Sequence, residues 1–136
     1  MRAVQATVGR TPARGPRSVP RRHVPMDAFT DLHTTDDAEA MLAASHEQPV
    51  WLLKHSSSCP VSAIGQLSFA GVTGGPPRYR VVVQRARDVS NALAESLGVR
   101  HETPQAILIA DGRAVTVLNH LKIQPGALRA AIDALP

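Results

Sequence analysis

Residues 50–62 read VWLLKHSSSCPVS, and the predicted fold is organised around this stretch. Its first four residues form a short continuous apolar run, which is typical of a buried strand, and Lys54 and His55 close that run. A polar serine turn follows. Pro60 then suits the first position of a helix, because it has no N–H to satisfy and its φ is already near helical. The stretch therefore predicts a strand, a turn and a helix, with Cys59 at the helix start.

Cys59 is the only cysteine among the 136 residues. At a helix start its sulfur would lie beside unsatisfied backbone N–H groups and the positive end of the helix dipole, and both favour the thiolate. Cysteines in such positions can have pKa values of roughly 3.5–7.5, and the thiolate is the nucleophilic form. The alternative is a buried apolar filler, but a filler requires neither a serine turn before it nor a proline after it. We predict a reactive thiolate.

Ser62 stands three residues after Cys59. Dithiol oxidoreductases carry a second cysteine at this spacing, because one helical turn brings the two sulfurs together. A chain with one cysteine cannot form an internal disulfide, so any redox cycle must pass through a mixed disulfide with another molecule. The single cysteine also excludes a disulfide scaffold and is typical of a reducing cytoplasm.

Length and composition fit one soluble domain with an aliphatic core. Of the 136 residues, 43% are hydrophobic and only four are Phe, Trp or Tyr. No apolar run approaches the roughly 18 residues that a membrane span requires, and the N-terminus lacks the apolar middle of a secretory signal. We expect a cytoplasmic protein with no membrane partner.

Residues 1–25 differ from the rest of the chain, because they hold six arginines, several prolines and no acidic residue. They have no hydrophobic period, so we predict a disordered extension before a folded domain at residues 26–136. The alternatives are a nucleic-acid-binding arm, a targeting peptide, or a mis-called stretch upstream of a true start at Met26. The other nine basic and all eleven acidic residues lie in 26–136, a net charge of −2. We expect no nucleic-acid partner, since the extension also lacks aromatic residues to stack on bases.

Helix and strand patterns alternate through the folded part. Strands that are separated by helices usually pair in parallel, whereas the Asp111-Gly112 turn predicts an antiparallel hairpin. The result is an α/β fold whose central mixed sheet of about four strands is flanked by helices. The predicted helices cover residues 35–48, 60–70, 89–97 and 125–134, and the predicted strands cover residues 50–53, 79–84, 105–109 and 114–118.

Two finer predictions concern single side chains. In the helix at 60–70, Ile64, Leu67 and Phe69 are expected to face the core, with Gly65 as a weak spot. Asp88 is expected to cap the helix at 89–97, and Gly98 to terminate it.

The order of elements resembles the thioredoxin fold. In that fold a reactive cysteine follows a strand at a helix start, and a cis proline precedes the first strand of the closing hairpin. Pro104, in the segment HETP at residues 101–104, occupies the second of these places. The resemblance implies a cis peptide bond before Pro104, beside Cys59, and the alternative is an ordinary trans proline that opens a strand.

A closer likeness is to the monothiol bacilliredoxin family, the thioredoxin-like proteins of the bacillithiol system. It covers about residues 27–135, and the arginine-rich extension has no counterpart. The family commonly has Thr before the active cysteine, where this chain has Ser58, and both residues supply a hydroxyl. The likeness is carried by the order and spacing of LKHS at 53–56, SCPVS at 58–62, VQ at 83–84, DVSN at 88–91 and GVRHETPQA at 98–106.

The resemblance implies removal of bacillithiol from S-bacillithiolated client proteins. Cys59 would attack the mixed disulfide, release the client thiol and become bacillithiolated, and a second thiol or a reductase would regenerate it. Bacillithiol is then a co-substrate, and no permanently bound cofactor and no metal is expected.

The resemblance also assigns roles around the nucleophile Cys59. Pro60 and the amides after it, together with Ser58 and Ser62, would stabilise the thiolate. Thr103 and Pro104 would offer backbone groups to the thiol ligand. The flanking histidines, His55 and His101, are each interpreted as structural or exposed in preference to a general base.

Two other functions remain open at this stage. One is a monothiol glutaredoxin-like protein that uses another low-molecular-weight thiol or handles an iron–sulfur cluster, which would need a ligand from outside because one cysteine cannot hold a cluster alone. The other is a non-enzymatic thioredoxin-fold adaptor whose cysteine is only regulatory.

Overall fold

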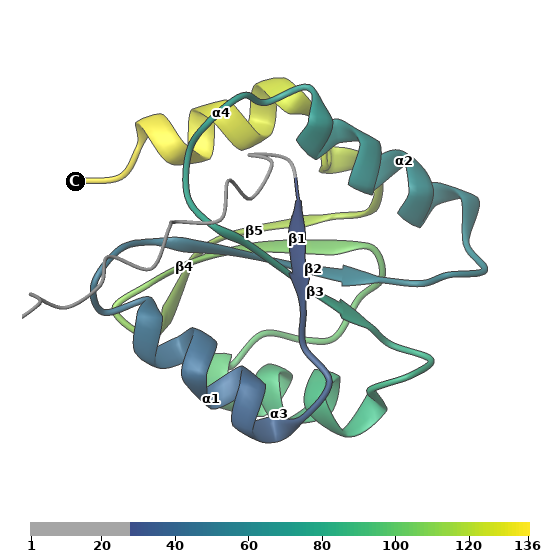
Figure 1. Ribbon diagram of the computed structural model, residues 1–136. Helices are drawn as coiled ribbons and strands as arrows, with labels where there is room; N and C mark the ends of the chain where they lie inside the picture. The colour runs from purple at the N-terminus through teal and green to yellow at the C-terminus, as the bar shows by residue number, and fades with distance from the viewer. Residues whose placement is uncertain (1–27) are drawn as a thin grey trace, which may run out of the picture.

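A computed structural model of the protein describes residues 28–136 (Figure 1). The predicted disordered extension at residues 1–25 and the alternative start at Met26 lie outside the described residues. Within the described range, no helix is long and apolar enough to cross a lipid bilayer. The elements in chain order are β1 (Phe29–Asp31), α1 (Thr35–Ala44), β2 (Val50–His55), α2 (Pro60–Ala70), β3 (Arg78–Val82), α3 (Arg87–Leu97), β4 (Gln105–Ala110), β5 (Arg113–Asn119), the 3₁₀ helix η1 (His120–Lys122) and α4 (Pro125–Asp133).

The five strands form one mixed sheet in the order β1-β3-β2-β4-β5. β3 runs parallel to both β1 and β2, whereas β4 is antiparallel to β2 and β5. The predicted α/β class and mixed sheet are therefore confirmed. The additional strand is β1, a three-residue edge strand that is too short to show a period of its own in the sequence.

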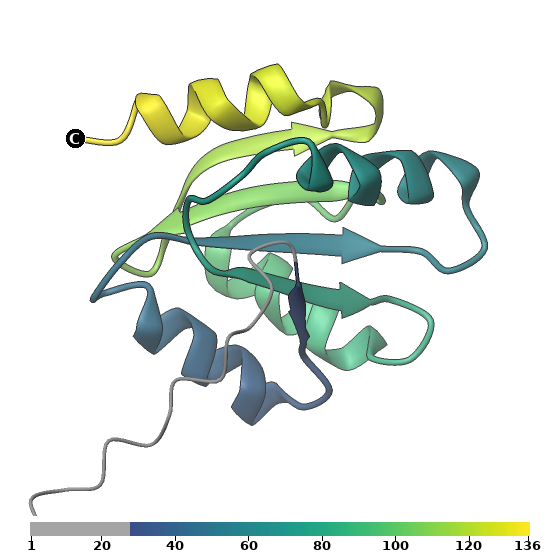
Figure 2. The same cartoon turned by 45° about the horizontal axis from the view of Figure 1, so that its top comes forward.

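Helices cover both faces of the sheet. α1 and α3 lie on one face and α2 and α4 on the other, as Figure 2 shows from a tilted view. Each pair encloses its own apolar core: Leu52 of β2 belongs to the first, and Trp51 and Leu53 belong to the second. Because successive side chains of a strand point to opposite faces, a strand covered on both sides must be apolar throughout. This is why the run at residues 50–53 lacks alternation.

Different hydrogen bonds define the start and the end of α1. Its start is a capping box, in which the Thr34 hydroxyl accepts from the Asp37 N–H at 3.1 Å and the Asp37 carboxylate accepts from the Thr34 N–H at 3.1 Å. The helix ends at Ala44, earlier than the predicted end before Pro49. Ser45 stops it, because its hydroxyl donates to the Leu42 carbonyl and its own carbonyl accepts from the β4–β5 turn.

That turn confirms the predicted hairpin. Asp111 and Gly112 both have positive φ, at 52° and 72°. This is the signature of a type I′ turn, which Asp-Gly favours because its twist matches that of the flanking strands. The turn is tied to the C-terminus of α1, since the Asp111 N–H donates to the Ser45 carbonyl at 2.9 Å and the Gly112 N–H donates to the Ser45 hydroxyl at 2.8 Å.

The boundaries around α3 correct two predictions. β3 ends at Val82, two residues before the predicted end at Gln84, because the chain turns directly afterwards. The N-cap of α3 is Ala86 and makes no side-chain cap, so Asp88 lies inside the first turn instead of capping it. Gly98 ends the helix with φ at 63°, as the sequence predicts.

The prediction for α2 was right for Phe69 and wrong for two of its neighbours. Phe69 is buried, but the Ile64 side chain is 53% exposed and the Leu67 side chain 70% exposed. The buried face consists largely of small residues, and a Cβ added to Gly65 would lie 3.4 Å from Pro104. Apolar residues are spread around α2, and two of its buried positions are the polar residues Ser62 and Ser68, so the sequence period does not indicate which face is inside.

A paired substitution on α2 tests this orientation. Phe69→Ala should lower the free energy of unfolding by roughly 3–5 kcal/mol, because it opens a cavity where the ring packs edge-to-face on Trp51 and Phe29. Leu67→Ala should stay within about 0.5 kcal/mol of wild type, since its side chain is already in water. Urea titrations followed by circular dichroism measure both, and similar losses in the two variants would contradict the orientation of the helix.

Candidate active site

Cys59 is the N-cap residue of α2, directly after the turn that follows β2. Its backbone is extended, with φ −104° and ψ 119°, and Pro60 begins the helix. The side chain is half-buried, so a disulfide partner can reach the sulfur. The structure therefore places the cysteine where the sequence predicts it, at a helix start at one end of the sheet.

The helix stabilises the thiolate of Cys59 directly. The pKa of Cys59 is lowered chiefly by the backbone N–H of Ser62, and further by the N–H of Val61 and the Ser62 hydroxyl, against the opposing effect of partial burial. These donors belong to the first turn of α2, whose N–H groups have no partner within the helix. A sulfur that accepts hydrogen bonds in its charged form is nucleophilic closer to neutral pH.

Ser62 joins the cysteine to the turn before it. The side chain is completely buried, and its hydroxyl accepts from the Ser56 N–H at 3.2 Å while it donates towards the sulfur of Cys59. A hydroxyl can do both because it has one donor and two acceptor lone pairs. Ser62 thus holds the position of a second cysteine without supplying a second sulfur.

Gln84 organises the serine turn, and the sequence analysis did not assign it a role. Its carbonyl oxygen accepts from the Ser57 N–H at 3.1 Å, and its amide donates to the hydroxyls of Ser56 at 2.6 Å and Ser58 at 3.2 Å. The available signal in the sequence was a polar residue two positions after β3, the strand that pairs with β2. The structure therefore places Ser58 against Gln84 and Ser56, next to the cysteine in the chain.

The segment before β4 completes this end of the sheet. The Thr103–Pro104 bond is cis, which confirms the bond predicted from the resemblance. Gln105, the first residue of β4, lies opposite Lys54 near the end of β2. Residues 101–104, which precede Gln105, are therefore at the same end of the sheet as the turn that carries Cys59. Pro104 is buried, and its carbonyl accepts from the His120 N–H at 2.9 Å.

His55 is a neutral residue under α2. Burial lowers its pKa, and the charge of Arg80 lowers it further. Arg80 itself is held by two contacts, to the Asp31 carboxylate at 2.6 Å and to the Gln66 amide oxygen at 2.8 Å. These contacts of Arg80 tie β1, β3 and α2 together.

Lys54 and His101 form a polar cluster on the opposite face of the sheet. Lys54 is completely buried, and its Nζ donates to the Ser90 carbonyl at 3.1 Å and lies 3.3 Å from His101 Nδ1. The Ser90 hydroxyl lies 3.2 Å from the same ring nitrogen. Burial lowers the pKa of Lys54 to about 8. From the sequence, Lys54 is expected only to close its strand. The structure adds its partners Ser90 and His101, which come from α3 and from the segment before β4 and are therefore far from Lys54 in the chain.

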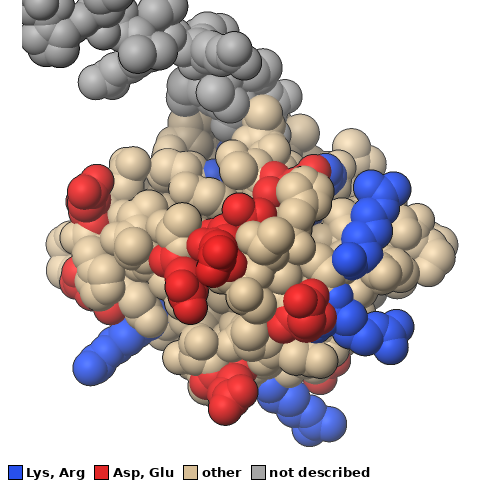
Figure 3. Space-filling view, turned by 60° about the horizontal axis from the view of Figure 1, so that its bottom comes forward, with Lys and Arg blue, Asp and Glu red and all other residues tan. Residues whose placement is uncertain are grey.

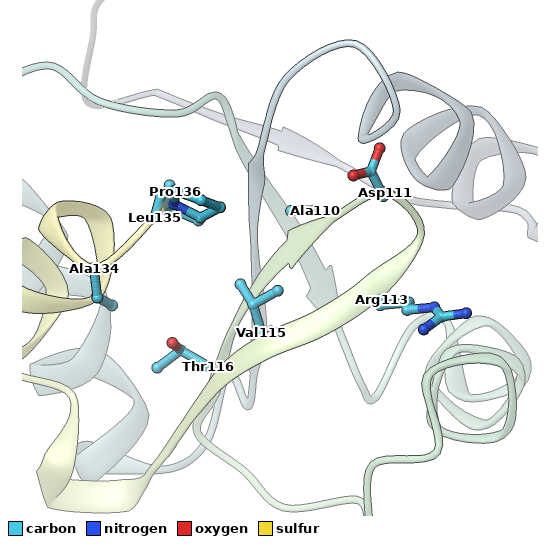
Figure 4. Close-up of a pocket in the computed structure, with 9 residues that line it drawn as sticks. Ala110, Asp111, Arg113, Val115, Thr116, Ala134, Leu135 and Pro136 are labelled. Carbon is cyan, nitrogen blue, oxygen red and sulfur yellow. The ribbon is translucent and has the colours of Figure 1, made fainter.

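A cavity of about 570 Å³ lies at the other end of the sheet, away from Cys59. It is formed by the β4–β5 turn and the C-terminal residues, including Asp111, Arg113 and Leu135 (Figure 4). β4 runs from Gln105 at the cysteine end to Ala110 at this cavity, so the strand separates the two places. Among the described residues, no three His, Cys, Asp or Glu side chains are grouped to hold a metal ion.

The sheet order, the cysteine at the start of α2 and the cis proline before β4 define a thioredoxin-fold protein with one cysteine at the redox position. Residues 30–128 match the family model described as monothiol bacilliredoxin BrxC, and the chain belongs to that family.

Solved structures agree on the fold. A protein described as a candidate oxidoreductase with a thioredoxin fold shares 29% identity at a TM-score of 0.67, over 76% of this chain and 92% of that one. A thioredoxin variant from Halobacterium salinarum is 18% identical at a TM-score of 0.64, over 83% and 98% of the two chains. A thioredoxin from Malassezia sympodialis is 19% identical at 0.60, over 81% and 92%.

The hydrogen bonds at the sulfur predict how Cys59 titrates. The rate of alkylation by iodoacetamide should follow a pKa below the usual value of about 8.5. Ser62→Ala should move that pKa upward, because it removes one donor to the thiolate. Ser68→Ala is the matched control on the same helix, since its hydroxyl donates to the carbonyls of Ile64 and Ile123. An unshifted curve for Ser62→Ala would show that this hydroxyl does not act on the sulfur.

The buried Lys54 predicts a dependence of stability on pH. Its pKa is about 8 in the folded protein and about 10.4 in an unfolded chain, so the unfolded state binds more protons between these values. Stability should therefore rise as the pH increases from 8 to 10. Lys54→Met should abolish the rise and be more stable than its parent at pH 7, by roughly 1–3 kcal/mol, because no charge is then buried.

Urea denaturation across this pH range measures the effect. Both proteins should carry Cys59→Ser, so that titration of the thiol does not contribute. Lys122→Met is the control, because Lys122 is exposed. A Lys54→Met protein that is less stable at pH 7 would show that the contacts of Nζ outweigh the cost of burying its charge.

Proposed function

We propose that this protein is a monothiol thiol–disulfide oxidoreductase that removes bacillithiol from S-bacillithiolated proteins in the cytoplasm. The observation that carries the proposal is the environment of Cys59, a thiolate-stabilising helix start with Ser62 in place of a resolving cysteine. Membership of the monothiol bacilliredoxin family supports bacillithiol as the thiol.

The first step is attack on the bacillithiol sulfur of the mixed disulfide. The Cys59 thiolate forms a new S–S bond to that sulfur while the bond to the client breaks, and the client cysteine leaves as a thiolate that takes a proton from water. The N–H groups of Val61 and Ser62 hold the attacking sulfur as its charge moves away. The client is reduced, and Cys59 is now bacillithiolated.

The second step needs a thiol from outside, because residue 62 has no sulfur to offer. A second bacillithiol, or the thiol of a reductase, attacks the bacillithiol sulfur on Cys59, forms a new disulfide with it and releases Cys59 as a thiolate. Two electrons pass from the external thiols to the client in each cycle. The cycle needs bacillithiol as a co-substrate and no bound metal.

The surroundings of Cys59 suit both partners of this reaction. Thr103 stands at the same end of the sheet, where its backbone groups can bind the extended part of a thiol ligand. Pro104 fixes this segment through its cis bond, because it has no N–H and its carbonyl already accepts from the His120 N–H. On the outer side of α2, Ile64 and Leu67 continue the surface that begins at the cysteine and are exposed to water. The polypeptide on either side of the client cysteine would cover this apolar strip while the mixed disulfide exists.

The lifetime of the Cys59 adduct tests the proposal. Purified protein is loaded with oxidised bacillithiol, the excess is removed, and intact mass is followed over time. The wild-type adduct should persist until reduced bacillithiol is added. Ser62→Cys should lose the adduct spontaneously, because the introduced thiol is close enough to form an internal disulfide and expel bacillithiol.

Ser68→Cys is the matched control, since it adds a thiol to the same helix two turns further on, under Ile123. Its adduct should be as durable as that of the wild type. Failure of wild-type protein to take up bacillithiol, or to release a bacillithiolated model protein, would refute the proposed activity. Equal lifetimes in Ser62→Cys and wild type would refute the role assigned to position 62.

A further inference from the structure

A polar cavity lies at the cysteine end of the molecule, on the α3 side of the sheet. Its volume is about 420 Å³, within the range of small-molecule sites. It is lined by Val83 after β3, by Arg87, Ser90 and Asn91 of α3, and by His101 before β4. Nothing in the reaction described above uses these side chains.

Two positively charged residues, Arg87 and Lys54, lie at or near this cavity. Arg87 stands at its rim as the first residue of α3, and the buried Lys54 lies behind it, in contact with Ser90 and His101. Burial lowers the pKa of His101, and the charges of Lys54 and Arg87 lower it further, against an opposing effect of Glu102. Figure 3 shows several Lys and Arg side chains at the right of the view, the side on which β2 and β3 end in Figure 1, with acidic side chains beside them and across the centre.

Acidic groups near the cavity do not balance this charge. Glu102 follows His101 in the chain, but its carboxylate lies 3.1 Å from the His120 ring on the other side of the β4 start. Asp88 lies in the first turn of α3 and does not line the cavity. α3 also begins without a side-chain cap, so its positive end is not neutralised by a capping oxygen. An anion is the ligand that this arrangement favours.

The cavity is connected to the reactive cysteine through adjacent residues. The Val83 N–H donates to the His55 carbonyl at 3.0 Å, which fixes the cavity wall against the end of β2. The next residue, Gln84, donates to the Ser58 hydroxyl at 3.2 Å, and Ser58 precedes Cys59. A small thiol bonded to Cys59 would extend past Ser58 and Gln84 to reach this cavity.

We propose that the cavity binds the carboxylate-bearing end of the low-molecular-weight thiol whose sulfur is bonded to Cys59. The inference rests on the proposed function and adds a recognition site to it. In bacillithiol this end is the malyl group, a dicarboxylate. Arg87 pairs with one carboxylate, which its planar guanidinium can bind through two hydrogen bonds, while Ser90 and Asn91 supply neutral partners.

The test compares charged and uncharged disulfides as reactants for Cys59. Rates of adduct formation are measured by intact mass with oxidised bacillithiol, oxidised glutathione and bis(2-hydroxyethyl) disulfide. Arg87→Gln should react about tenfold more slowly with oxidised bacillithiol, as expected when a charge-assisted hydrogen-bonded pair is lost. Its rate with the uncharged disulfide should remain within about twofold of wild type, because that molecule has no group for Arg87.

Arg85→Gln is the matched control, since Arg85 is an exposed arginine two residues earlier that does not line the cavity. It removes the same net charge and should keep wild-type rates with all three disulfides. A parallel loss with oxidised glutathione in Arg87→Gln would mean that the cavity binds carboxylates of either thiol, and a loss with oxidised bacillithiol alone would assign it to the malyl group. Both results support the inference.

Two results would overturn it. Equal slowing in Arg85→Gln and Arg87→Gln would attribute the effect to the general charge of the surface. An Arg87→Gln protein that keeps the wild-type rate with oxidised bacillithiol would leave the proposed function intact and remove the recognition site. Wild-type protein that forms no adduct with any of the disulfides would refute the proposed function itself.

Discussion

The double burial of β2 is the constraint on which the rest of this structure depends. The strand is hydrogen-bonded to β3 on one edge and β4 on the other, and helices cover both of its faces. Such a strand has little freedom to shift, because a slip of one residue would exchange the side chains of the two cores. Its last residues therefore hold the serine turn in place, and the turn holds Cys59 at the start of α2.

The two faces at the end of β2 serve different purposes. On the α2 face, His55 is neutral beneath the helix, and the thiolate interacts with the N–H groups above it. On the α3 face, Lys54 brings a positive charge into the protein, with a serine carbonyl and a histidine ring as neighbours. Burying an amine is unfavourable for folding. The buried Lys54 therefore places a positive charge beside the polar cavity at a cost to stability.

At position 62, an oxygen atom in place of a sulfur atom determines whether Cys59 has a second thiol beside it. A sulfur at this position could form an internal disulfide with Cys59, whereas the Ser62 hydroxyl lowers the pKa of Cys59 and provides no second sulfur. The hydroxyl is completely buried and also fixes the Ser56 N–H. Position 62 therefore combines a structural contact with the chemical property that makes the protein monothiol.

The sequence by itself determined the order of the four longer helices and four longer strands, the Asp111-Gly112 hairpin and the place of Cys59, because each depends on contacts within a few residues. Proline at a helix start, a capping box and a turn with positive φ act locally, and local chemistry is readable from the chain. Tertiary structure decided the rest. In α2 the apolar residues are spread around the helix and two buried positions are serines, so only its packing on Pro104 and the sheet determined that Phe69 is inside and Leu67 outside. The roles of Gln84 and Lys54 arise from hydrogen bonds between residues 26 to 47 positions apart, and no pattern along the chain encodes such distances.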